Sequence, residues 1–120
     1  MKKITAQDKA KLIARAAAEK MGEDIVLIDM RGHAAIFDWF VLVSASSSRR
    51  INAISRQIQK DLSVEGCRPM NIEGRRNLYW MLMDYEDVVV NVFHEDVREF
   101  YGLDRLWSDA PSERFESDAK

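Results

Sequence analysis

One segment constrains the fold of this chain more than any other. Residues 73–107 have the pattern of two adjacent strands followed by a short helix. The strands Leu78–Asp84 and Asp87–Phe93 are predicted to form a hairpin, and Asp96–Tyr101 is predicted to form the helix, which stops at Gly102. Both faces of the first strand carry apolar side chains. Either helices cover both faces of this hairpin, or one face binds a partner.

The preceding part of the chain begins with a predicted helix over residues 5–21, with Thr5 as its N-cap. Asp24–Met30 and Trp39–Ser46 are short, apolar and β-branched, as is typical of buried strands. The connection between them is too short for a crossover helix, so we expect antiparallel pairing. The apolar face of the helix consists of Leu12, Ile13, Ala16, Ala17 and Met21.

A second helix is predicted to start at Ser46-Ser47-Ser48 and to end at Gly66. Pro69–Glu73 is expected as a strand parallel to the Trp39 strand through a right-handed crossover. The order α-β-β-α-β-β-β-α predicts an α/β (α+β) fold, a mixed five-stranded sheet packed with helices. Residues 1–111 are expected to form a single domain, and residues 112–120 a polar, disordered tail. The buried face of the second helix is predicted to consist of Ile51, Ile54, Ile58 and Leu62.

Composition restricts the class of partner and the compartment. The 120 residues include 18 basic and 20 acidic side chains, without the basic excess that is usual in proteins bound to bare nucleic acid. Cys67 is the only cysteine, so an intrachain disulfide is excluded, which fits a reducing cytoplasm. The start of the chain does not have the pattern of a signal peptide, and the apolar runs are too short to span a bilayer. A cytoplasmic protein without membrane attachment is expected.

The residues that usually carry catalysis or hold metals do not occur in suitable patterns. A zinc site needs three or four ligands, and this chain has one cysteine and two separated histidines, His33 and His94. His94-Glu95 begins like HExxH, but Arg98 stands at the second histidine position. A strand with a DxD pair, a Walker A loop and a GxGxxG loop are all missing from the sequence. We therefore expect no metal, no cofactor and no enzymatic activity.

The serines before the second helix have two readings. Their place between a strand and a helix resembles a nucleophile elbow, but the glycines of GxSxG are absent. Serine is a preferred N-cap residue, so capping is the simpler reading. The alternative is an anion or RNA contact at the helix start, where hydroxyl and guanidinium groups gather and Arg56 and Lys60 extend the basic character. The residues of this alternative site are Ser47, Ser48, Arg49 and Arg50.

The turn end of the hairpin favours a protein-binding role. Asp84, Tyr85, Glu86 and Asp87 lie together there, so carboxylates surround an aromatic ring. Tyrosine and tryptophan are over-represented at interface hot spots, and an acidic surface complements a basic protein. Most other aromatic side chains of the hairpin are expected in the core, because aromatic residues in strands are usually buried.

The chain as a whole resembles the ribosomal silencing factor family, also called the Iojap family. The resemblance runs from about residue 8 to Pro111, and the order and spacing of its segments make it specific. The matching segments are DIVLIDMRG (24–32), DWFVLVSASSSR (38–49), Glu73-Gly74, WMLMDYEDVVVNVF (80–93), REFYGLDRLW (98–107) and Asp109-Ala110-Pro111.

This resemblance implies a fold similar to that of nucleotidyltransferases, without their catalytic carboxylates. It implies binding to the large ribosomal subunit through its fourteenth protein (L-fourteen), which blocks joining of the small subunit when nutrients are scarce. Some members dimerise when free, and an organellar branch acts in ribosome assembly. The alternatives are an assembly factor that contacts rRNA and a degenerate nucleotidyltransferase-like nucleotide-binding protein. By motif, the partner-binding residues are Trp80, Leu82, Asp84, Tyr85 and Asp87, followed by His94, Arg98 and Tyr101.

Three positions depart from the family pattern. Glu86 stands in the turn where the family usually has glycine, and a left-handed glutamate is about 1 kcal/mol less favourable. A turn of another type is the expected consequence. Asn91 stands where histidine is common, which argues against a titrating switch there. Ala45 replaces a common glycine, which argues against close approach of the backbone to a phosphate.

Overall fold

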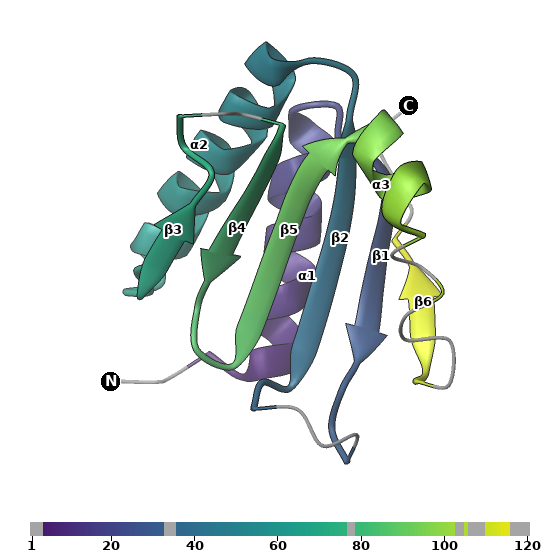
Figure 1. Cartoon of the computed structure of the whole chain (residues 1–120). Helices are drawn as coiled ribbons and strands as arrows, with labels where there is room; N and C mark the ends of the chain where they lie inside the picture. Colours follow the sequence, from purple (N-terminus) through teal and green to yellow (C-terminus); the bar gives the residue numbers. More distant parts are fainter. Residues whose placement is uncertain (1–3, 33–35, 77–78, 103–104, 106–109, 116–120) are drawn as a thin grey trace.

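The computed structural model describes residues 4–32, 36–76, 79–102, 105 and 110–115. The elements found in these residues form one mixed sheet with helices packed on it, in the strand order β3-β4-β5-β2-β1-β6 (Figure 1). This is the α/β class predicted from the sequence. The elements are α1 (Ala6–Glu19), β1 (Glu23–Asp29), β2 (Trp39–Ala45), α2 (Ser48–Val64), β3 (Asn71–Glu73), β4 (Trp80–Asp84), β5 (Val88–His94), α3 (Glu95–Tyr101) and β6 (Ser112–Arg114).

The predictions that rested on short-range signals in the sequence are confirmed. β1 pairs with β2 antiparallel, and β4 pairs with β5 antiparallel as a hairpin. The Thr5 side chain accepts a hydrogen bond from the backbone N–H of Asp8 at 3.1 Å, and the Ser47 side chain accepts one from Arg50 at 3.1 Å. Both bonds satisfy donors that a helix start leaves without intrahelical partners. The capping residues therefore fix where α1 and α2 begin.

The prediction of a disordered tail from residue 112 is wrong for its first residues. Ser112–Arg114 forms β6, which pairs antiparallel with β1 and makes the sheet six-stranded. The side chains of β6 are exposed, so apolar periodicity could not reveal this strand. The edge of β1 supplies main-chain partners instead, and the backbone N–H of Phe115 donates to the carbonyl of Ile25 at 2.9 Å.

β3 runs in the predicted direction but lies elsewhere in the sheet. It is an edge strand that pairs antiparallel with β4, so β4 and β5 separate it from β2. The parallel neighbour of β2 is β5. In a simple β-α-β unit, β3 would pair directly with β2. Here the β4–β5 hairpin, which follows β3 in the sequence, lies between these two strands.

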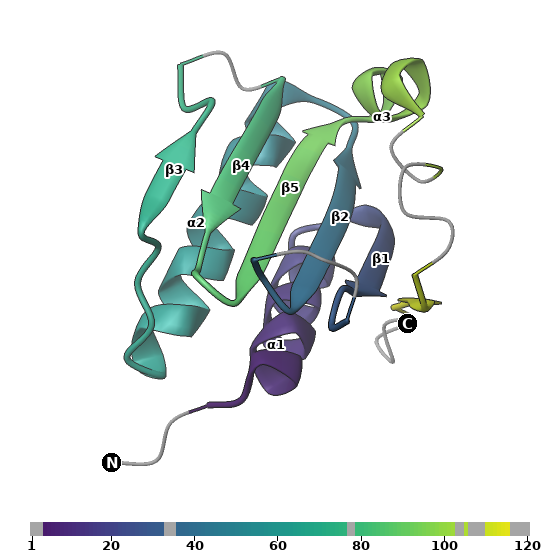
Figure 2. The same cartoon turned by 60° about the horizontal axis from the view of Figure 1, so that its bottom comes forward.

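The main core lies between the sheet and the two long helices. Figure 2 shows α1 and α2 side by side on one face of the sheet. The predicted apolar face of α2 is fully buried in this core, which confirms the helical spacing. From the hairpin, Met81, Met83 and Tyr85 point into the same layer, as do Val88, Val90 and Val92.

The end of α1 departs from the prediction at Met21, whose side chain is 63% exposed. Met21 has a positive φ of 65° and turns the chain away from the helix axis. Gly22 follows, where a Cβ atom would lie 2.8 Å from Cγ1 of Val43 and 2.9 Å from the carbonyl oxygen of Ala17. The helix therefore ends before Met21, because the chain must pass close to β2 at the glycine.

The opposite face of the sheet is covered at one end only, where α3 lies across β5 and β2 among the described elements (Figure 1). A second, smaller cluster forms there, with Phe93, Leu42 and Ile28 buried and Val97 of α3 packed against them. Away from α3 this face carries buried side chains, such as Ile28 and Asn91, alongside half-buried ones. We call the half-buried set Val26, Phe40, Trp80, Leu82, Asp84 and Val89 the open face.

Candidate functional site

The sheet divides the predicted hairpin residues into two groups. Trp80, Leu82 and Asp84 alternate along β4 and lie on the open face. Register places Leu82 opposite Asn91, and Asp84 opposite Val89. The structure therefore brings together three of the predicted contact residues on a surface that no described helix covers.

Trp80 is held in a fixed orientation on this surface. Its indole Nε1 donates a hydrogen bond to Oδ1 of Asn91 at 2.9 Å, and its ring meets Phe93 edge to face at 6.0 Å between centroids. A rigid, partly accessible aromatic ring is a common anchor at protein interfaces, because little side-chain entropy is lost on binding. Asn91 is buried, so the residue that departs from the family pattern has a structural role here.

Phe40, Val26 and Val89 complete the open face, and the sequence reasoning missed all three. Phe40 stacks on Phe37 at 5.4 Å between ring centroids. These residues come from β1, β2 and β5, so only sheet pairing places them on the same face as Leu82. Alternation along each strand could have indicated which residues share a face, but not which face the helices leave uncovered.

Tyr85 was predicted among the partner-binding residues, but the structure places its side chain away from the surface. The side chain is 2% exposed and belongs to the core beneath the helices. Burial, and secondarily the charge of a Cys67 thiolate, raise the pKa of the Tyr85 phenol well above its ordinary value. Among the described residues its hydroxyl has no hydrogen-bond partner. Tyr85 therefore supports the turn from within.

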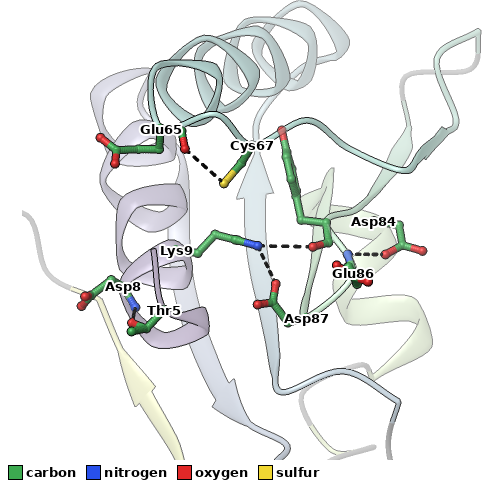
Figure 3. Close-up of polar contacts among 9 residues, drawn as sticks. Thr5, Asp8, Lys9, Glu65, Cys67, Asp84, Glu86 and Asp87 are labelled. Atoms are coloured by element: carbon green, nitrogen blue, oxygen red, sulfur yellow. Dashed lines mark hydrogen bonds and ion pairs between the residues drawn. The ribbon is translucent and has the colours of Figure 1, made fainter. Parts of the chain in front are cut away.

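Asp87 also faces inward. One carboxylate oxygen lies 2.7 Å from Nζ of Lys9, which additionally donates to the Tyr85 carbonyl at 3.5 Å (Figure 3). The side chains of Lys9 and Asp87 are 10% and 34% exposed, so the pair is largely shielded from water. The backbone carbonyl of Asp87 accepts from the N–H groups of Asp38 and Trp39. These contacts fasten the turn to α1 and to the start of β2.

The turn itself keeps the left-handed geometry that glycine would favour. Glu86 has a φ of 77°, so the expectation of another turn type is wrong. The carboxylate of Asp84 accepts a hydrogen bond from the Glu86 N–H at 2.8 Å (Figure 3). The Tyr85 N–H donates to the Val88 carbonyl at 2.9 Å. These bonds offset the strain and leave the Glu86 side chain exposed beside Asp84.

The predicted residues of α3 mainly hold the helix in place. Arg98 is 8% exposed, donates to the Asp24 carbonyl and to the Ser44 hydroxyl, and lies over the Phe93 ring at 5.7 Å. His94 caps the helix, with Nδ1 accepting from the Asp96 N–H at 3.2 Å. The side chains of Arg98 and His94 are therefore engaged within the protein and are not presented as main contacts for a partner. The side chain of Tyr101 and the whole of His33 lie outside the described residues.

The start of α2 supports the capping reading of the serines. The Ser47 hydroxyl oxygen is engaged with the Arg50 N–H, while Ser48 and Arg49 are exposed. In the part of the chain that the structure describes, no group of three His, Cys, Asp or Glu residues could hold a metal ion. No helix within the same residues is long and apolar enough to cross a membrane.

Comparison with known proteins gives consistent results. The family described as "Ribosomal silencing factor during starvation" matches residues 3–120. The ribosomal silencing factor of Bacillus subtilis (strain 168) is 39% identical over 101 residues, which is 84% of this chain and 86% of the relative. That of Halalkalibacterium halodurans is 34% identical over 110 residues, covering 92% and 94%. A crystal structure of a Chromobacterium violaceum protein superposes with a TM-score of 0.84 at 27% identity, covering 98% of both chains.

Proposed function

Because this chain belongs to the ribosomal silencing factor family, we propose that it represses translation by occupying the joining surface of the large ribosomal subunit. Membership in the family supports ribosome-associated regulation of translation as the functional class. The proposed partner is the fourteenth protein of the large subunit, as the family resemblance implies. Bound there, the protein sterically excludes the small subunit, and repression scales with the fraction of large subunits occupied. No chemical step is required.

The open face is the observation that carries this proposal. Its half-buried apolar side chains lie on four adjacent strands, β4, β5, β2 and β1, so they are fixed to the sheet rather than to a loop. Such a surface can bury apolar area against a partner with little ordering of its own groups. Asp84 at its edge and the exposed Glu86 beside it add negative charge, which favours association with a basic ribosomal protein.

The contacts made by the carboxylates favour a binding role over an enzymatic one. Asp29 receives two hydrogen bonds from the Arg31 guanidinium, at 2.9 and 2.7 Å. Asp87 is paired with Lys9, and Asp84 accepts from the turn backbone. Carboxylates that hold structure in this way do not converge on one point, as phosphoryl or nucleotidyl transfer would require.

The test is co-sedimentation of the purified protein with separated subunits and with a mixture of both. We expect the wild-type protein to travel with the large subunit and to lower the amount of joined ribosome. Leu82→Arg places a charge on the open face between Trp80 and Asp84, and we expect its affinity for the large subunit to fall at least thirtyfold, on the order of a hot-spot loss of about 2 kcal/mol. Light scattering of the same preparations reports whether the free protein is the dimer that the resemblance implies.

Met21→Arg is the matched control, since it also replaces an apolar side chain by arginine and Met21 is 63% exposed outside the open face. It should bind the large subunit like wild type. Equal binding by both variants, with native circular dichroism, would exclude the open face as the docking site. A wild-type protein that stays at the top of the gradient with the large subunit would contradict the function itself.

A further inference from the structure

A second surface lies on the helical side of the molecule, between α2 and the β3 edge of the sheet. Two adjoining hollows, of about 530 Å³ and 280 Å³, share Arg56 and Gln59 as lining residues and so form one groove along α2. We name this surface the α2–β3 groove. Its cationic lining residues are Arg56, Lys60, Arg68 and Arg75. We propose that this groove binds the sugar-phosphate backbone of an RNA strand.

The charge of this region is opposite to that of the rest of the chain. Residues 48–76 carry seven basic and three acidic side chains, although the whole chain has a net charge of −2. Among the described residues, none of the four groove cations has a carboxylate partner within ion-pair distance. The one acidic residue of α2, Asp61, accepts a hydrogen bond from Gln57 at 2.9 Å. The groove is therefore a positive strip available to an external anion.

The geometry suits a chain of phosphates better than a single ion. Arg56 and Lys60 stand one turn apart on α2, about 6 Å along the helix axis, which is comparable to the spacing of successive phosphates in a strand. Arg75 approaches from the β3–β4 turn. This turn needs Gly74 at a φ of 91°, because a Cβ atom there would lie 2.1 Å from the Trp80 carbonyl oxygen. The backbone conformation at Gly74 thus fixes the position from which the Arg75 side chain reaches the groove.

The lining chemistry favours RNA phosphates over an acidic protein segment. Arginine guanidinium groups bind phosphate oxygens with two parallel hydrogen bonds, and the Asn52 amide adds a further donor. The described lining contains no aromatic ring that could serve as a protein hot spot or stack on a base. Recognition would therefore be independent of sequence and directed at the backbone. This inference rests on the proposed function in one respect, since the large subunit would supply the RNA.

The groove is distinct from the start of α2 that the sequence indicated as an anion site. Ser47, Ser48, Arg49 and Arg50 do not line either hollow. Of the cations named in the sequence reasoning, only Arg56 and Lys60 take part, joined by Arg68 and Arg75 from outside the helix. Docking through the open face and contact through the groove use opposite faces of the sheet.

The experiment measures binding of the full-length protein to a fluorescent oligo(U) strand across a range of salt concentrations. Three to four phosphate contacts predict that log K falls with log salt with a slope of about −2 to −3. Arg56 and Arg68 are exposed, so Arg56→Glu/Arg68→Glu should fold normally. We expect this variant to bind at least about tenfold more weakly at low salt and to lose about 1.4 from the slope.

The matched control is Lys11→Glu/Arg15→Glu, which makes the same charge change at exposed positions of α1. It should retain wild-type affinity and slope. The proposal is overturned if wild type does not bind oligo(U) at low salt, or if the two double variants lose affinity equally. It is also overturned if polyglutamate binds better than oligo(U) and the groove variant loses that binding, since the partner is then an acidic protein. A parallel sedimentation with the large subunit reports on the proposed function separately.

Discussion

The ion pair between Lys9 and Asp87 allows a prediction that separates a structural role of the turn from a partner-binding role. The Lys9 ammonium lies 2.7 Å from the Asp87 carboxylate, and its side chain is 10% exposed. Removing one partner of a fully buried pair costs about 3–5 kcal/mol, because the other charge is left without compensation. Asp87 is 34% exposed and the Tyr85 carbonyl remains near Lys9, so the cost should be smaller here. For Asp87→Asn we expect the free energy of unfolding to fall by roughly 2 kcal/mol.

Lys9→Met should be milder, at about 1 kcal/mol, because the unpaired Asp87 can still reach water. In the variant Lys9→Met/Asp87→Asn neither charge remains, so its loss should be about that of Lys9→Met alone. The double-mutant cycle then gives a coupling free energy of roughly 1.5–2 kcal/mol. Urea denaturation followed by tryptophan fluorescence measures all four proteins, and thermal scans should show Asp87→Asn melting roughly 6–12 °C lower.

Additive effects in this cycle, or an Asp87→Asn protein as stable as wild type, would refute the reasoning. Co-sedimentation with the large subunit below the melting temperature completes the test. The structural role predicts that folded Asp87→Asn keeps its affinity within about threefold, since the carboxylate faces α1. Full stability with lost binding would instead return Asp87 to the set of partner contacts.

Three further substitutions test the turn and α3. Tyr85→Phe removes a buried hydroxyl without a partner among the described residues and should stabilise the fold by up to about 1 kcal/mol. Because the folded-state pKa of Tyr85 is raised, wild type should lose stability as pH rises above about 10, the unfolded-state pKa, and Tyr85→Phe should lose less in alkaline urea melts. Glu86→Gly should stabilise the fold by about 1 kcal/mol in the same melts, because glutamate is strained at the φ of 77° found there. A destabilised variant would show that Glu86 is not strained. Arg98→Lys loses the hydrogen bonds to Asp24 and Ser44 and should lower the free energy of unfolding by about 2 kcal/mol. An unchanged melting temperature would show that these two hydrogen bonds do not stabilise the fold.

The secondary structure was predictable because its signals act over a few residues. Thr5 and Ser47 cap the helices that they precede, and the apolar spacing on α2 marks the face that is buried. Two short apolar runs, Leu78–Asp84 and Asp87–Phe93, on either side of a polar turn indicated the hairpin. Each of these signals connects a residue to neighbours within one or two turns of the chain, so it can be read without tertiary context.

The candidate site was only partly predictable, for a physical reason visible in the hairpin. Alternation indicated that Trp80, Leu82 and Asp84 share a face, but both faces are apolar in sequence. Which face stays open depends on where α1 and α2 pack. Tyr85 and Asp87 were expected at the surface, yet they are held by the core and by Lys9, which is 78 residues from Asp87 in the chain.

The sequence by itself determined the described elements from α1 to α3, their order and the family to which the chain belongs. Tertiary structure alone decided the neighbours of β3, the pairing of β6 with β1, and the choice of the open face. Local propensities and caps are short-range interactions, whereas sheet order and burial depend on contacts between segments far apart in the chain. The same long-range packing brings Arg56, Arg68 and Arg75 into one groove, which no periodicity in the sequence could reveal.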